Sequence, residues 1–118
     1  MPERGSARNR SLFLLDMQGC CTKILRYSQG RTKQHFFADE MLVDAVLRNL
    51  EVLGEAAKQI PPAVRERYPK LPWRRIAGLR DVLAHACFSL EEDTIWQIVP
   101  ERIPALADQL DQVVEAEL

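Results

Sequence analysis

The sequence predicts an all-α fold, an antiparallel four-helix bundle with short extra helical turns. Two observations lead to this prediction. Apolar residues recur at spacings of three and four along the long segments, and no segment shows the β-branched alternation that is typical of a strand. A chain of 118 residues is long enough to bury one core. We therefore expect a single helical domain over residues 1–118, with residues 1–8 as a flexible N-terminal tail.

The first helix is expected from about Asn9 to Ser28. One stripe of this segment has helical spacing and should face the core; it consists of Leu14, Met17, Cys21, Ile24 and Ser28. Gly30 is a natural end for the helix, because glycine readily adopts the left-handed conformation that often follows a last helical turn. Residues 32–37 then fit a short helical turn.

A long second helix is expected to run to about Ile60, with Asp39 as its N-terminal cap. Its apolar stripe consists of Leu42, Val46, Leu50, Leu53, Ala57 and Ile60. Pro61 and Pro62 should end it, because proline lacks the backbone N–H and its ring clashes with the preceding turn. Residues 64–67 form at most another short turn.

The third helix is expected from Trp73 to about Ala84, directly after Pro72, a position at which helices often begin. Its core-facing stripe consists of Trp73, Ile76, Leu79 and Leu83. Arg75 lies near Arg80 on another side of this helix.

A fourth helix is expected to follow Ser89, which has the capping-box spacing to Glu92. Its stripe consists of Trp96, Val99, Ile103, Leu106, Leu110 and Val113. Pro100 and Pro104 interrupt this stripe. They should kink the helix or split it.

The composition excludes several classes of protein. Hydrophobic residues make up 47% of the chain and charged residues 28%, which is typical of a soluble globular protein. No apolar run is long enough for a bilayer or for a signal peptide, so we expect a cytoplasmic protein without a membrane partner. The three cysteines, two of them adjacent, fit neither a disulfide framework nor a CxxC metal pair. We therefore expect reduced thiols, no metal and no cofactor.

Charge is distributed unevenly along the chain, although the formal net charge is only −1. The basic segment, residues 65–80, has six basic residues against one acid, whereas residues 91–118 have eight acids against one arginine. Tyr68 and Trp73 lie among the basic residues, as in surfaces that bind RNA. The candidate RNA-binding residues are Arg67, Lys70, Arg74 and Arg75. The alternative is that both segments are ordinary solvated helix faces.

Arg80 and His85 are the residues that could perform catalysis. An imidazole can take a proton from a ribose 2′-OH or give one to the leaving oxygen, and a guanidinium can bind phosphate oxygens as negative charge builds up. This route needs no metal. Five residues correspond to about 140° on a continuous helix, so we expect the helix to end near His85 and its loosened last turn to let the imidazole approach Arg80. The alternative is a helix-terminal histidine beside a solvated arginine.

Residues 42–57 and 72–85 resemble the HepT-like branch of the HEPN superfamily. The likeness covers nearly the whole chain and includes Arg67-Tyr68-Pro69 and Trp96. It implies a HEPN-type bundle that dimerises and brings two Arg-x4-His motifs together across a two-fold axis, forming a metal-independent endoribonuclease. It also implies a toxin of a toxin–antitoxin pair, whose antitoxin is a minimal nucleotidyltransferase.

Cys87 departs from this family, whose motif continues His-x-Tyr. In the relatives that are controlled by adenylylation the modified group is that tyrosine, so Cys87 predicts an antitoxin that covers the cleft of Arg80 and His85 instead. Structurally, the residue is interpreted as a small semi-buried side chain at a turn, with a redox or catalytic thiol as the alternative. Cys87 also favours a second hypothesis for function, a non-catalytic HEPN module that binds nucleotide, RNA or a nucleotidyltransferase partner.

Three further polar residues are candidates for supporting the site. Asn49 and Glu55 lie on or beside the stripe of the second helix, where they could either order the bundle interior or orient Arg80 or His85. Asp81 is a further candidate for orienting the catalytic residues. The other histidine, His35, is interpreted as a surface or packing residue.

Overall fold

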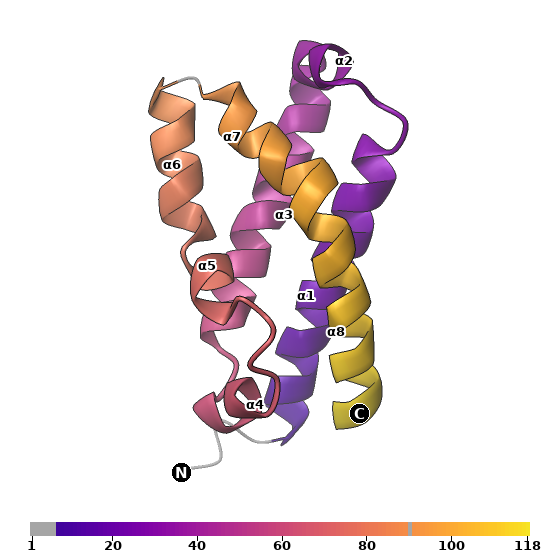
Figure 1. The fold of residues 1–118 in the computed structure, drawn as a ribbon, viewed down its shortest axis with the longest axis vertical. Helices are drawn as coiled ribbons and strands as arrows, with labels where there is room; N and C mark the ends of the chain where they lie inside the picture. The colour runs from indigo at the N-terminus through magenta and orange to yellow at the C-terminus, as the bar shows by residue number, and fades with distance from the viewer. Residues whose placement is uncertain (1–6, 90) are drawn as a thin grey trace.

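The computed structural model describes residues 7–89 and 91–118, with the side chains of 9–85 and 91–118. The helices, in order, are α1 (Ala7–Ser28), α2 (Lys33–Ala38), α3 (Glu40–Lys58), α4 (Pro62–Arg67), α5 (Trp73–Ala77), α6 (Leu79–Ser89), α7 (Glu92–Gln97), the π-helix η2 (Ile98–Arg102) and α8 (Ile103–Glu117). The described residues contain no strand. The long helices run alternately up and down (Figure 1), so the predicted all-α, antiparallel architecture is confirmed.

The hydrophobic core lies in the interior of the bundle, between the packed helices. α1 packs along both α3 and α8, and α3 also contacts α5 and α6. The predicted stripes are confirmed, because nearly all their members are buried and the remainder, Ser28, Leu42 and Trp96, are half-buried. Each helix therefore contributes its apolar face to one shared interior, which is what holds the bundle together.

The predicted caps of the first two long helices are confirmed. Gly30 has a positive φ of 73° just after α1. The Thr32 hydroxyl accepts a hydrogen bond from the His35 N–H (3.2 Å) at the start of α2. The Asp39 carboxylate accepts one from the Leu42 N–H (3.1 Å) at the start of α3. Each cap satisfies a backbone group that the first helical turn leaves without a partner.

The expected N-terminal tail needs a correction at its end. Residues 7 and 8 belong to α1, so the helix begins before the predicted Asn9. Residues 1–6, the rest of the expected tail, lie outside the described residues.

The third predicted helix is wrong in two respects. It is broken at Gly78, which ends α5, and its second part, α6, continues past Ala84 to Ser89. The segment 79–89 contains neither glycine nor proline, so nothing local stops α6 at the predicted place. The break falls at Gly78 because glycine has more backbone freedom to lose in a helix than any other residue.

The fourth helix begins later than the capping box predicted. Ser89 lies in α6, and the N-cap position of α7 belongs to Glu91, whose side chain makes no capping hydrogen bond. The effect of the prolines is confirmed, because η2 separates α7 from α8. Here the Ile103 N–H bonds the Ile98 carbonyl, five residues back, which is the wider spacing of a π-helix.

Within the described parts of the chain, none of the helices combines the length and the apolar character needed to cross a membrane.

Candidate functional site

Arg80 and His85 both lie on α6, and both side chains are exposed, by 67% and 75%. Because α6 continues for a further turn beyond His85, the two residues stand about 140° apart around the helix axis. The expected approach of the imidazole to the guanidinium at a loosened helix end is therefore wrong. Instead, each side chain lies near a different acid.

Arg80 is held toward α3. Its Nη1 lies 3.7 Å from Glu55 Oε1, and the same oxygen is 3.4 Å from the Nζ of Lys58. Glu55 thus sits between two cations, one from its own helix and one from α6. This is the contact that an orienting role of Glu55 requires.

His85 lies near an acid on the other side of α6. Its Nε2 lies 3.9 Å from Glu91 Oε1, at the start of α7. Glu91 was not among the residues that the sequence singled out. The available signal was an acid six residues after the histidine, in the first turn of the predicted fourth helix, but only the packing of α7 against α6 places it near the imidazole.

The remaining candidates for supporting roles lie apart from this pair of contacts. Asn49 donates its amide hydrogen bond to the Ala45 carbonyl of its own helix (2.8 Å), which favours the ordering role over the orienting one. Asp81 is exposed in the first turn of α6. The backbone at Cys87 is helical, so it does not stand at a turn, and its side chain lies outside the described residues.

Some residues of the basic segment are exposed to solvent, and others make contacts within the protein. Lys70, Arg74 and Arg75 are exposed, as a surface that contacts phosphates requires. Trp73 is in the core, and its indole N–H donates to the Tyr68 carbonyl (2.9 Å). Trp73 is therefore unavailable for stacking on RNA bases, contrary to the expectation from the sequence.

Arg67 is engaged by Glu117, at the end of α8. Two of its nitrogens donate to the carboxylate, at 3.1 and 2.7 Å, and the Tyr68 hydroxyl donates to the same group at 2.7 Å. These hydrogen bonds lower the pKa of Glu117, and they raise the pKa of Arg67 and of Tyr68. Among the four candidate RNA-binding residues, Arg67 is thus the one committed to a contact within the protein.

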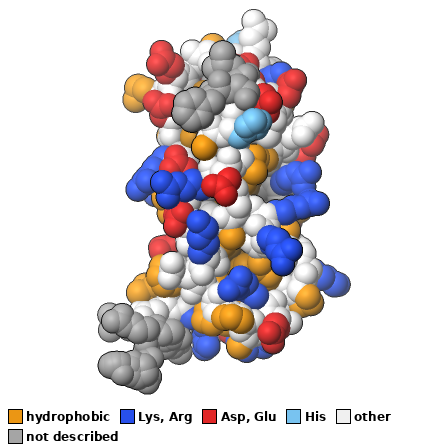
Figure 2. Space-filling model, turned by 90° about the vertical axis from the view of Figure 1, so that its left-hand side faces the viewer, with side chains coloured by type: hydrophobic (Ala, Val, Ile, Leu, Met, Phe, Trp, Pro, Cys, Tyr) orange, Lys and Arg blue, Asp and Glu red, His pale blue; other side chains and the backbone are white. Residues whose placement is uncertain are grey.

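Figure 2 shows the face of the molecule formed by α5 and α6. Basic side chains gather across its middle, with acidic side chains among them and hydrophobic atoms between. A groove of about 460 Å³ separates α5 and α6 from η2 and α8. Its apolar lining includes Leu79, Val82 and Ile98, with Arg75 and Arg102 beside them.

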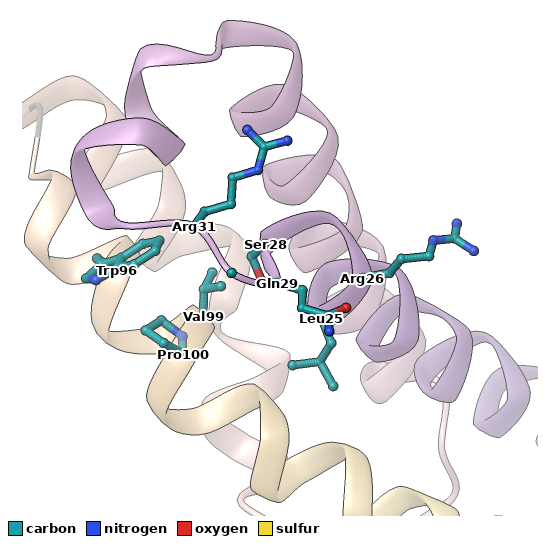
Figure 3. A pocket seen from close by; sticks show the side chains of 9 residues that line it. Leu25, Arg26, Ser28, Gln29, Arg31, Trp96, Val99 and Pro100 are labelled. Atoms are coloured by element: carbon teal, nitrogen blue, oxygen red, sulfur yellow. The ribbon is translucent and has the colours of Figure 1, made fainter.

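A second cavity, of about 480 Å³, lies where the end of α1 meets η2. Trp96 and Pro100 form one wall and Leu25 the other, while the guanidinium groups of Arg26 and Arg31 point away from the space between them (Figure 3). Neither Arg80 nor His85 lines it. This cavity has apolar walls and no charged group directed into it, so it is a poor site for phosphate.

Two of the three cysteines are free and buried in α1. Burial raises the pKa of the Cys21 thiol to about 12, and burial also raises the pKa of Cys20. A protonated, buried thiol is a weak nucleophile, so these residues are packing groups. No group of three or more His, Cys, Asp or Glu side chains in the described residues is placed to hold a metal ion.

Comparisons with known proteins agree on one family. The family model described as "Ribonuclease HepT-like" matches residues 17–113. "Probable ribonuclease HepT" from Thermococcus cleftensis is 32% identical over 90% of this chain and 96% of its own length. "Putative RNase MJ0125" from Methanocaldococcus jannaschii is 32% identical over 92% and 93%. "Putative RNase TTE0752" from Caldanaerobacter subterraneus is 35% identical over 82% and 87%. No solved structure matches the chain.

Proposed function

Because the chain belongs to the HepT-like ribonuclease family, we propose that it is a metal-independent endoribonuclease, the toxin of a toxin–antitoxin pair, that cleaves RNA with Arg80 and His85. Family membership and the relatives named as ribonucleases support an RNA nuclease. One observation favours this pair of residues. Both side chains are exposed on one helix beside a basic surface, and each is held by a carboxylate.

The proposed chemistry uses the two side chains for different tasks. The ribose 2′-oxygen attacks the adjacent phosphorus, and the bond from phosphorus to the 5′-oxygen breaks. His85 accepts the 2′-proton or supplies the proton that the leaving 5′-oxygen takes up. Arg80 binds the non-bridging phosphate oxygens, where negative charge increases in the transition state. Arg80 thereby provides the positive charge that a metal ion provides in other nucleases.

Two protomers are needed to complete the site. On one α6 the two side chains leave the helix in directions about 140° apart, so they do not converge on one phosphate. A two-fold axis close to α6 would bring Arg80 of one protomer next to His85 of the other. The same axis would bring His85 of the first protomer next to Arg80 of the second. We therefore propose a homodimer with two composite sites.

Cleavage of purified total RNA tests the catalytic assignment. Arg80→Ala and His85→Ala should each lower the rate by about 10²-fold or more, and wild-type cleavage should survive EDTA. His35→Ala is the matched control, because His35 is an exposed histidine on another helix, and it should leave the rate unchanged. Loss of wild-type activity with chelator, or full activity in both site variants, would rule the mechanism out.

Mixing the two inactive variants tests the composite site. In a heterodimer of Arg80→Ala and His85→Ala one site receives both wild-type side chains and the other receives neither. After subunit exchange, half of the dimers are mixed, so activity should return to roughly a quarter of wild type. No recovery from a mixture shown to contain heterodimers would contradict the composite arrangement.

The proposed partner is a minimal nucleotidyltransferase antitoxin. An open reading frame for such a protein beside this gene would support the toxin–antitoxin pair.

The alternative function is a HEPN module that binds nucleotide, RNA or that partner without cleavage. It is favoured by Cys87, which stands in place of the family's tyrosine. It predicts RNA binding that depends on Lys70, Arg74 and Arg75 with no cleavage by the wild-type protein. The cleavage assay above therefore separates the two.

A further inference from the structure

The His85 imidazole stands in solvent on one flank of α6, and a side chain so exposed samples several rotamers. A general acid or base has to be held in one orientation to reach the proton it transfers. Among the described side chains, the group within ion-pair distance of His85 is Glu91, with Oε1 at 3.9 Å from Nε2.

Glu91 occupies an unusual position for a glutamate. It is the N-cap residue of α7, where serine, threonine, aspartate and asparagine are preferred because their short side chains bond the first free N–H groups. The Glu91 side chain makes no such bond. Its Oε2 accepts a hydrogen bond from the Thr94 hydroxyl (3.4 Å), which leaves Oε1 directed toward His85. The Glu91 carboxylate therefore contacts His85 on α6 and does not cap α7.

The helix that carries Glu91 is well anchored to the rest of the bundle. Lys33, in α2, pairs with Asp93, and Ile95 is buried in the core. The Trp96 ring packs against Phe36, with centroids 5.3 Å apart. Glu91 thus projects from an element whose position is set by the core, and not from a free loop.

We propose that Glu91 is a positioning residue for His85; this inference rests on the function proposed above. A small rotation of the exposed His85 side chain that closes the 3.9 Å gap lets the carboxylate accept the Nε2–H of the imidazole. Nδ1 is then the nitrogen left free to exchange a proton with the 2′-hydroxyl or the leaving oxygen. The same carboxylate stabilises the imidazolium that forms after His85 has taken up a proton. Arg80 and His85 then each have one acidic partner, Glu55 from α3 and Glu91 from α7.

Glu91→Ser tests this role and separates it from a role in folding. Serine is a better N-cap than glutamate and too short to reach His85, so the melting temperature should stay the same or rise while kcat falls about tenfold and KM is unchanged. Glu92→Ser is the matched control. Glu92 is the neighbouring exposed acid in the first turn of α7, and its loss should leave both kinetic constants at the wild-type values.

A second measurement does not depend on activity. Side-chain NMR relaxation of the His85 imidazole should show a lower order parameter in Glu91→Ser than in the wild type or Glu92→Ser. Equal kcat and equal order parameters in the two serine variants would overturn the inference. If His85→Ala instead retains full activity, the proposed function fails and not merely the role of Glu91, so the two failures can be distinguished.

Discussion

At the scale of single residues, the carboxylate of Glu117 forms a polar anchor outside the candidate site. Its carboxylate receives hydrogen bonds from Arg67 and Tyr68 and lies 3.9 Å from Arg10. It therefore ties the end of α8 to α4 and to α1. Because the hydrogen bonds favour the charged carboxylate, its pKa in the folded protein lies below the ordinary value of 4.5.

A lowered pKa of a carboxyl group makes stability depend on pH. The stabilisation is fully present above pH 4.5, where the unfolded chain is also ionised, and it is lost as the pH falls through the lower pKa of the folded protein. Glu117→Gln should therefore lower the melting temperature by several degrees at pH 7, and by less in strong acid. Glu115→Gln, an exposed acid on the same helix, is the control. Equal melting curves for the two variants at pH 7 would contradict this anchor.

Cys87 leads to a prediction about control by the antitoxin. A tyrosine offers an oxygen that forms a stable phosphodiester with AMP, whereas the sulfur of cysteine is shorter in reach and a poor match for the same transfer. After co-expression with the nucleotidyltransferase partner and ATP, the intact mass should show no added AMP, and inhibition should disappear on dilution. An adduct at Cys87 or Tyr68, with inhibition that persists once the partner is removed, would restore control by modification.

At the scale of helices, Gly54 sets how closely α5 approaches α3. A Cβ at this position would stand 2.9 Å from the Ile76 carbonyl and 3.4 Å from the Leu79 Cβ. The first of these atoms is backbone and cannot rotate away. Glycine is therefore required at this helix crossing, although its backbone freedom disfavours it inside a helix.

Two glycine substitutions check this close approach. Gly54→Ala should lower the free energy of unfolding by about 1–3 kcal/mol, because the extra methyl group forces the helices apart. Gly19→Ala in α1 meets no atom within 4 Å and should stabilise the protein by about 0.5–1 kcal/mol. Urea denaturation measures both. Since Glu55 follows Gly54 directly, displacement of the crossing should also weaken RNA cleavage in the first variant, while the second should cleave normally.

At the scale of the whole molecule, the proposed dimer requires a contact surface on α6. Val82 lies between Arg80 and His85 in sequence and is 40% exposed, so it presents an apolar side chain to solvent on α6. If the two-fold axis passes close to this helix, a charged residue substituted for Val82 would lie in the dimer interface and weaken it.

Light scattering should find wild-type protein as a dimer at micromolar concentration. Val82→Asp should shift it to monomer and abolish cleavage, because each site would lose its second protomer. Met41→Asp is the control, since Met41 is also exposed but belongs to the first turn of α3 and not to α6. A wild-type monomer that cleaves RNA would contradict both the dimer and the composite site.

Local sequence patterns were sufficient to predict most of the fold. The cap at Asp39, the stop at Gly30 and the interruption by Pro100 and Pro104 all depend on backbone groups within a few residues of one another. The stripes depend only on helical periodicity. For these features the physical cause is contained in a short stretch of chain, so the sequence by itself determined them.

The candidate site was only partly predictable. The sequence alone led to Arg80 and His85 as the chemical pair and to Glu55 as a supporting residue. The tertiary structure decided that Glu91 lies near the imidazole and that Trp73 is in the core. These outcomes depend on how separate helices pack. Periodicity and capping rules contain no information about distances between helices that are remote in sequence.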